Sequence, residues 1–70
     1  MKKDTKWENI TERELEVLDL LSRGYTSKAI AEQLFISPNT VEFHRRQLLK
    51  KTESRNIAEL IGNAYRQGIL

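Results

Sequence analysis

The sequence predicts an all-α fold of four short helices, and three features support this prediction. Apolar residues recur every three or four positions in each segment, which is the spacing of one face of an α-helix. Ser, Thr or Asn precedes each segment, where a helix needs a cap. The one proline and two of the three glycines stand at segment boundaries rather than in hairpin turns. We expect helices over about 12–23, 27–34, 38–51 and 56–67, within one domain over 9–70 and with no strand.

The first helix has a specific start signal in "ITEREL", residues 10–15. Thr11 can cap the helix while the Glu14 side chain returns to the cap amide, and Ile10 can pack against Leu15. The predicted apolar stripe comprises Leu15, Val17, Leu18 and Leu21. Gly24 suits the left-handed residue that follows a helix end.

Only a few residues join the second and third helices. Thr26 or Ser27 can cap the second helix, whose apolar face comprises Ile30, Ala31 and Leu34. Ser37 can cap the third helix, with Pro38 at the first helical position, where its missing N–H does no harm. Two helices joined so closely must cross steeply, as in a helix-turn-helix.

The fourth helix is opened by Asn56, with Glu59 three residues later. Its predicted core residues are Ile57, Leu60, Ile61 and Ala64. Gly68 ends the helix. At the other end of the chain, residues 1–8 are expected to form a flexible N-terminal arm, although Trp7 can pack back on the domain.

Composition limits the class of protein. A chain of 70 residues buries only about 60 to 65% of its unfolded surface, so every helix must share one core. No cysteine is present for a disulfide or a thiolate metal site. The apolar runs are too short to span a membrane, and "MKKDTKWENI" lacks the apolar region of a signal peptide. We expect a cytoplasmic protein that binds no membrane, metal or cofactor.

Charge is unevenly distributed along the chain. Residues 8–32 hold six acids and three bases, whereas residues 42–55 hold five bases and two acids. A basic concentration around one element is the footprint of a surface that meets a polyanion. A solvated helix face would give the same pattern, so charge alone does not decide.

The third helix has two distinct sides. Val41 and Leu48 face the core with Arg45 at the edge, and His44 is expected to pack with one nitrogen satisfied. The outer side comprises Asn39, Glu42, Phe43, Arg46 and Lys50. These are side chains that a DNA major groove accepts, because arginine can pair with guanine, an aromatic ring can meet a thymine methyl, and a carboxylate can accept from cytosine N4. Glu42 is alternatively a solvated charge, since a carboxylate beside phosphates opposes binding.

Residues 10–51 together resemble the LuxR-type helix-turn-helix family, whose pattern is roughly L-T-x-R-E-x-E-V-L-x-L, then G-x-S/T-x-K-x-I-A-x-x-L-x-I-S-x-x-T-V-x-x-H. The resemblance implies a four-helix domain that binds double-stranded DNA with its third helix, the recognition helix. Domains of this family are implied to act as the output domain of response and quorum-sensing regulators, or as a stand-alone regulator of the spore-germination type. Carried over by position, the base-reading residues are Glu42, Phe43 and Arg46. The implied DNA-backbone contacts are Thr26, Ser27, Lys28, Ser37, Asn39, Thr40 and Lys50.

The sequence departs from the family pattern in two places. After Lys51 it reads "TES" where the family usually has L-G-V, so the third helix is expected to fray or extend over 51–55, because Glu53 adopts the left-handed conformation less readily than glycine. Glu42 stands where many relatives carry a lysine or arginine.

The fourth helix carries the candidate dimer interface. One recognition helix reads only a few base pairs, so selectivity favours a homodimer on two half-sites. The predicted interface residues are Glu59, Gly62, Asn63, Arg66 and Gln67. RNA polymerase is a further possible partner. Two alternatives stay open, a sigma-factor-like promoter-reading domain and a helical protein-interaction adaptor. An enzyme is disfavoured, because no acid and base residues cluster and no glycine loop can cradle a phosphate.

Overall fold

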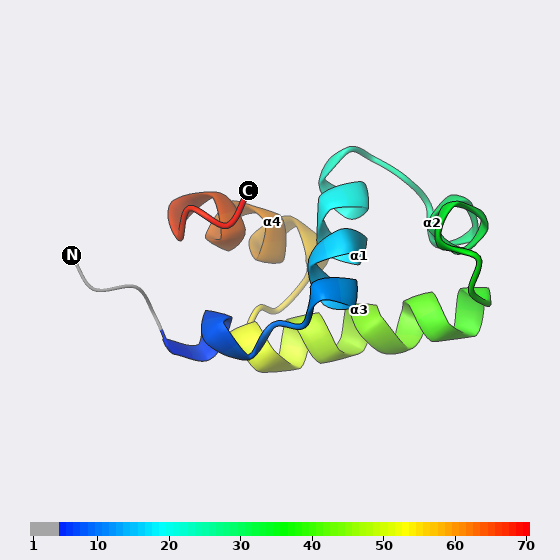
Figure 1. The fold of residues 1–70 in the computed structure, drawn as a ribbon. Coiled ribbons are helices and arrows are strands. Elements are labelled where there is room, and N and C mark those ends of the chain that lie inside the picture. Colours follow the sequence, from blue (N-terminus) through cyan, green and yellow to red (C-terminus); the bar gives the residue numbers. More distant parts are fainter. Residues whose placement is uncertain (1–4) are drawn as a thin grey trace.

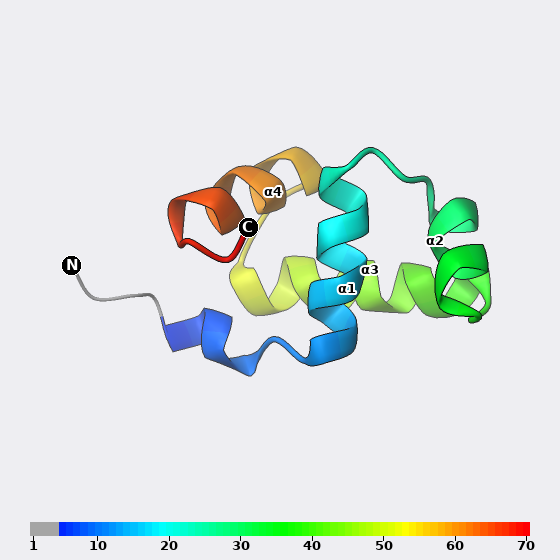
Figure 2. The same cartoon turned by 45° about the horizontal axis from the view of Figure 1, so that its top comes forward.

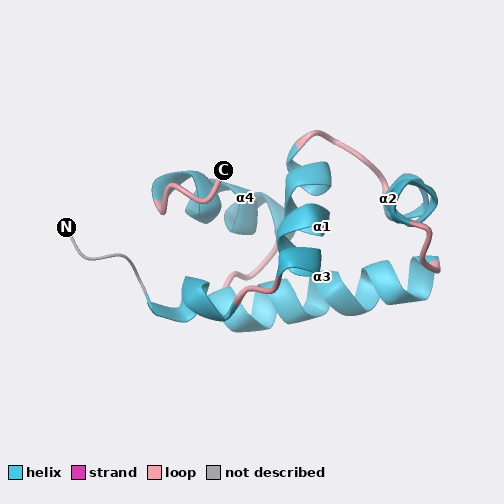
Figure 3. Cartoon of the chain, in the orientation of Figure 1, coloured by secondary structure: helices cyan, strands magenta, loops and turns pink. Residues whose placement is uncertain are grey.

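The computed structural model describes residues 5–70. A short 3-10 helix η1 (Thr5–Asn9) precedes α1 (Glu12–Ser22), α2 (Ser27–Leu34), α3 (Pro38–Thr52) and α4 (Ile57–Arg66) (Figures 1 and 3). No strand occurs in the described range, and the predicted all-α fold with four α-helices is confirmed. None of these helices is long and apolar enough to cross a membrane.

The long helix α3 is the scaffold of the domain and contacts every other element. α1 crosses α3 near its middle, α2 packs at its N-terminal end, and η1 and α4 lie toward its C-terminal end (Figures 1 and 2). The buried core comprises Trp7, Val17, Leu18, Leu21, Ile30, Ala31, Val41, Leu48, Leu60 and Ala64. Because the other elements cover α3 from one side, its opposite side stays exposed.

All four α-helices begin at side-chain caps. In α1, Thr11 Oγ1 accepts from the Glu14 amide at 3.1 Å, and Glu14 Oε1 accepts from the Thr11 amide at 2.9 Å, which completes the predicted capping box. The other caps are Thr26, Ser37 and Asn56, each accepting from the amide three residues later. Such caps typically stabilise a helix by about 1 kcal/mol each. Thr26, rather than Ser27, caps α2.

Four residues in the left-handed region follow the helix ends. Gly24 and Gly68 have φ of +88° and +73°, as their positions predict. Phe35 and Glu53 also adopt positive φ, at 58° and 55°. This conformation costs a non-glycine residue roughly 1–2 kcal/mol.

At the end of α3 the helix extends and does not fray, which is one of the two predicted outcomes. The helix runs one residue further than predicted and stops at Thr52, with Glu53 in the left-handed conformation. The Ser54 amide then donates to the Leu49 carbonyl at 3.0 Å, which closes the helix end. Lys6 Nζ lies 2.8 Å from Glu53 Oε2. The Glu53 side chain is therefore tied to η1, and a glycine is not required for the stop.

In the predicted N-terminal arm, Trp7 packs back on the domain, as the sequence allowed. Thr5–Asn9 forms η1, which packs on α3, and Trp7 is only 6% exposed. Burying an indole ring provides more apolar area than any other residue type, and a small domain gains from it. Residues 1–4 of the predicted arm lie outside the described residues.

The predicted apolar stripe of α1 needs one correction. Val17, Leu18 and Leu21 are buried, but Leu15 is 38% exposed. Glu14 is buried in its place, at 3% exposure. The carboxylate is accepted into the interior because the Thr11 amide and the Lys51 ammonium both donate to it.

Candidate nucleic-acid interface

One side of α3 is exposed. Asn39, Phe43, Arg46 and Lys50 are all exposed and follow one another at spacings of three or four residues. Val41 and Leu48 are fully buried on the opposite side and fix the helix on the core. The Phe43 ring is 50% exposed. The exposed side therefore presents an aromatic ring and two cations in a fixed row.

Glu42 is oriented differently from this row. Its Oε1 accepts a hydrogen bond of 2.5 Å from Ser27 Oγ, at the start of α2. Arg45 Nη1 donates to the same Ser27 Oγ at 3.0 Å, and Arg45 Nε lies 3.8 Å from Glu42 Oε2. Ser27, Glu42 and Arg45, which we call the α2–α3 clamp, thus join the two helices of the helix-turn-helix. Arg45 was expected to extend outward into solvent from the edge of the core, and it instead binds within the clamp.

The remaining predicted backbone-contact residues cluster at the starts of the same two helices. Thr26 caps α2 and Ser37 caps α3, where the Thr40 hydroxyl also lies 2.9 Å from Ser37 Oγ. Lys28 is exposed in the first turn of α2. Both helix starts direct unpaired amides and the positive end of a helix dipole away from the core. The structure thus places the predicted residues in two groups, one at each helix start.

The lysine and arginine side chains near this surface differ in whether they have a partner within the domain. Within residues 5–70, Lys28, Arg46 and Lys50 have neither an ion pair nor a side-chain hydrogen bond. Lys51, which follows Lys50 directly, instead donates to Glu14 Oε1 at 2.8 Å and to the Asn9 carbonyl at 3.1 Å. Lys51 therefore joins α3 to the start of α1, whereas Lys50 is free to meet an anion.

Glu14 is the partner that sequence reasoning missed. Burial alone would raise the pKa of its carboxyl, but hydrogen bonds from Lys51 and from the Thr11 amide, with the charge of Lys51, outweigh burial and lower that pKa below 4.5. The carboxylate is thus held ionised inside the domain. The capping box was the only sequence signal for Glu14, and it gave no indication of Lys51, which is 37 residues away.

His44 has one buried nitrogen without a partner. Its Nδ1 is buried and has no hydrogen-bond partner in the described part of the chain, so the satisfied nitrogen expected of this residue stays a prediction for Nε2. The imidazole ring contacts the Phe43 ring edge-on, with 5.8 Å between ring centroids and an interplanar angle of 64°. Such edge-to-face contacts are favourable for aromatic rings. His44 therefore supports the exposed ring of Phe43.

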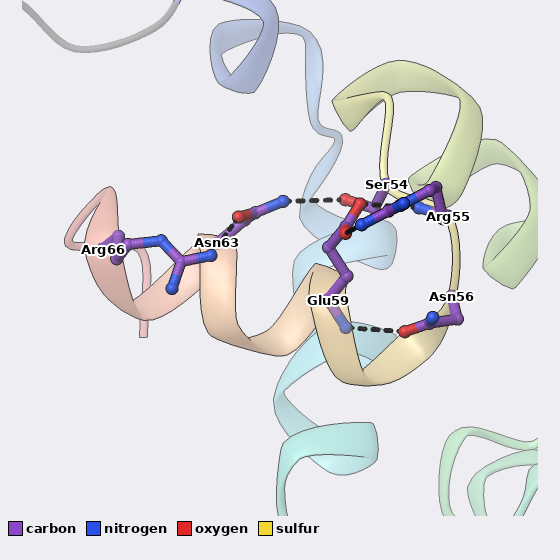
Figure 4. A network of polar contacts seen from close by, with 6 residues as sticks. All are labelled: Ser54, Arg55, Asn56, Glu59, Asn63 and Arg66. Carbon is purple, nitrogen blue, oxygen red and sulfur yellow. Dashed lines mark hydrogen bonds and ion pairs between the residues drawn. The ribbon is translucent and has the colours of Figure 1, made fainter.

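Three of the predicted dimer residues on α4, Glu59, Asn63 and Arg66, lie in a polar network (Figure 4). Glu59 accepts from the Arg55 side chain at 3.0 and 3.1 Å, and from the Arg55 amide at 2.9 Å. These hydrogen bonds lower the pKa of the Glu59 carboxyl. Asn63 accepts from Arg66 and donates to Ser54 Oγ at 3.3 Å. Arg66 is exposed, whereas Glu59, Gly62, Asn63 and Gln67 are half-buried rather than freely exposed.

Comparison with known proteins decides the family. Residues 8–64 match the family described as "Bacterial regulatory proteins, luxR family". The chain belongs to the LuxR family. It is a LuxR-type DNA-binding domain of a transcriptional regulator, and this family points to a regulator rather than an enzyme.

The relatives of this LuxR-type domain are longer proteins. It is 39% identical over 61 residues to the oxygen regulatory protein NreC of Staphylococcus carnosus (strain TM300) and, at the same identity, to NreC of Staphylococcus haemolyticus (strain JCSC1435). The aligned part covers 87% of this chain but 28% of each NreC. The chain thus spans about 28% of the length of these curated relatives.

Proposed function

We propose that the domain is the sequence-specific output module of a longer transcriptional regulator and that it inserts α3 into the major groove of duplex DNA. The observation that carries this proposal is the exposed row on α3. Phe43, Arg46 and Lys50 are exposed there, and neither cation has an ion pair within residues 5–70, although α3 is otherwise the most contacted helix. An α-helix fits the width of the major groove, where base edges are distinguishable.

Direct base reading is assigned to Arg46 and Phe43. The guanidinium of Arg46 can donate two parallel hydrogen bonds to guanine O6 and N7, and the Phe43 ring can pack on a thymine methyl. Both are exposed on successive turns of a helix whose opposite side is fixed by Val41 and Leu48. A rigid helix is the support that base reading requires, because a shift of the side chain by 1 Å breaks a paired contact.

Phosphate binding is assigned to the two helix starts and to the free cations. Helix starts attract phosphate through their amides and dipole. The residues concerned are Thr26, Ser27, Lys28, Ser37, Asn39, Thr40 and Lys50. Lys28, Arg46 and Lys50 are the cations in this set and its neighbourhood that lack an acidic partner among residues 5–70. Log affinity falls with log salt concentration, and each phosphate neutralised by a cation makes this slope more negative by about 0.9.

The assembled regulator is proposed to be a cytoplasmic homodimer joined through α4. The surface concerned comprises Glu59, Gly62, Asn63, Arg66 and Gln67. Two copies would occupy half-sites about 34–36 Å apart, one turn of the duplex. RNA polymerase is the partner that such a bound dimer would act on.

Selection of bound sequences from a randomised duplex library, at two salt concentrations, tests the proposal. We expect a motif with two half-sites. Arg46→Ala should then relax the preference at one base position, at a cost of about 1–3 kcal/mol in binding free energy. Lys50→Ala should weaken binding to all duplexes alike and make the salt slope shallower by about 1.

Three other results of this selection would contradict the proposal. Equal losses on selected and random duplexes for both variants would remove the division between base and phosphate contacts. Salt-sensitive binding without a motif would favour the adaptor alternative. A motif recovered only when RNA polymerase is added would favour a sigma-factor-like domain.

A further inference from the structure

We propose that Glu42 controls DNA recognition as a positioning residue, through Ser27 and Arg45, rather than by accepting a hydrogen bond from a base. This inference rests on the proposed binding of α3 in the major groove. Glu42 lies beside the exposed row on α3, and its position in the sequence alone predicts a direct contact with a base.

The polar atoms of the clamp already engage one another within the domain. The single hydroxyl proton of Ser27 is donated to Glu42 Oε1 at 2.5 Å, and Ser27 Oγ accepts from Arg45 Nη1 at 3.0 Å. Glu42 Oε2 faces Arg45 Nε at 3.8 Å. A movement of the carboxylate toward a cytosine amino group would weaken its hydrogen bond with Ser27 and its ion pair with Arg45. Direct reading therefore opposes contacts that the folded domain already makes.

The clamp is located where it can set the register of the domain on DNA. Ser27 follows the cap residue Thr26, at the start of α2 where a phosphate is proposed to bind. Glu42 directly precedes Phe43, and Arg45 directly precedes Arg46. Phosphate contacts fix the orientation of a protein on the duplex, and base contacts then report the sequence. The clamp fixes the start of α2 against α3. It thereby sets the position of Arg46 and Phe43 relative to the phosphate that is proposed to bind at the start of α2.

The clamp also controls the charge presented to DNA. Paired with Arg45, Glu42 adds little net repulsion beside phosphates, and Arg45 adds little attraction. Without Glu42, Arg45 would be a fourth uncommitted cation beside Lys28, Arg46 and Lys50. Attraction to phosphate is independent of sequence, so freeing Arg45 strengthens binding to every duplex. Loss of Glu42 thus lowers discrimination in two ways, by loosening the register and by raising non-specific affinity.

A double-variant cycle on the selected duplex and on scrambled duplexes tests this assignment. The ratio of the two affinities should fall about tenfold in both Glu42→Ala and Ser27→Ala, and the combined variant should be no worse than either, because both remove the same hydrogen bond. Glu42→Ala should also bind scrambled duplexes more tightly, with a salt slope steeper by about 0.9. Ser27→Thr retains the hydroxyl and should retain discrimination. Thermal unfolding of every variant checks that it is folded at the assay temperature.

The opposite pattern would overturn the assignment. If Glu42→Ala abolishes preference at one base pair and Ser27→Ala leaves recognition intact, Glu42 reads a base. Additive losses in the combined variant would equally exclude a shared role. Failure of the wild-type domain to select any motif would instead reject the proposed function, and this inference with it.

Discussion

At the scale of single residues, the partners of a charged side chain decide whether it is available to DNA. Arg45 and Arg46 are neighbours in the sequence, as are Lys50 and Lys51. In each pair one cation is held by an internal acid and the other has no such partner within residues 5–70. Arg45 belongs to the α2–α3 clamp, and Lys51 belongs to the link between α3 and Glu14. The basic concentration over 42–55 is therefore only partly a DNA-binding surface.

The buried Glu14 makes stability depend on pH in the acid range. Its pKa is lower in the folded domain than the usual 4.5, so the unfolded chain binds more protons as the pH falls. The stabilisation from Glu14 is thus complete above about pH 4.5 and is lost as the pH falls through the lower, folded pKa. We expect Glu14→Gln to lower the free energy of unfolding at pH 7 by about 1–3 kcal/mol, since glutamine keeps the cap but leaves Lys51 without its anion.

Urea unfolding at pH 7 and at pH 3 measures this difference. The gap between wild type and Glu14→Gln should narrow at pH 3, because the stabilisation from the carboxylate is lost as the pH falls through its lowered pKa. Glu16→Gln is the matched control, because Glu16 is exposed on the same helix and its one ion pair among residues 5–70 is with Arg13. Its effect should stay within about 0.5 kcal/mol. A gap for Glu14→Gln that stays constant between the two pH values would show that Glu14 acts through packing and not through charge.

At the scale of helices, the ends of α2 and α3 store strain that a glycine would release. Phe35 has φ of 58° and is 94% exposed, so its ring contributes no packing to offset the conformation. We expect Phe35→Gly to raise the free energy of unfolding by about 0.5–1 kcal/mol, the left-handed penalty less the greater entropy of an unfolded glycine. Glu53→Gly should gain less, because it also loses the contact with Lys6.

Thermal unfolding of these variants, with Phe35→Ala for comparison, distinguishes the effect of backbone strain on stability from the effect of the exposed ring. Alanine removes the ring but keeps the left-handed penalty, so Phe35→Ala should unfold close to the wild type. If alanine stabilises the domain as much as glycine, the backbone conformation is not the cause.

The helices were predictable because their signals are local, and the sites were less so because their contacts are not. Capping residues act within three positions, which is why Thr11, Ser37 and Asn56 indicate the helix starts. The Lys6–Glu53 and Glu14–Lys51 contacts connect residues 47 and 37 positions apart. No spacing pattern reports such pairs. These two contacts support the packing of η1, the end of α3 at Thr52 and the burial of Glu14.

At the scale of the whole molecule, one domain is too small to specify a long operator. Its longest dimension is 38 Å, and α3 has 15 residues, about 22 Å of helix. The core holds α3 from one side, and α4 packs beside the C-terminal half of α3 and extends past its end (Figure 2). α4 is thus positioned to join a second copy while leaving the exposed row of α3 free. Two copies joined in this way would read two half-sites.

The polar network on α4 shapes what such a dimer requires. A side-chain carbon at Gly62 would lie 3.6 Å from Arg66 Nη2, so the arginine of the same helix covers the space above Gly62. Close approach of a partner helix must displace this guanidinium, which also binds Asn63. We therefore expect the free domain to dimerise only weakly. Arg66→Glu and Gly62→Arg should each weaken the dimer further, by reversing the charge and by filling the contact point.

Sedimentation across protein concentration measures this association, and the same variants can be followed on the selected duplex. Lys28→Glu is the matched control, since it reverses a charge on α2, away from α4, and should leave self-association unchanged. On DNA, the α4 variants should bind one half-site normally but lose the cooperative binding of two. A dimer that forms equally well in wild type, Arg66→Glu and Gly62→Arg would place the interface elsewhere. The two half-sites would then have to be joined by segments outside this domain, of the kind that make the NreC relatives longer.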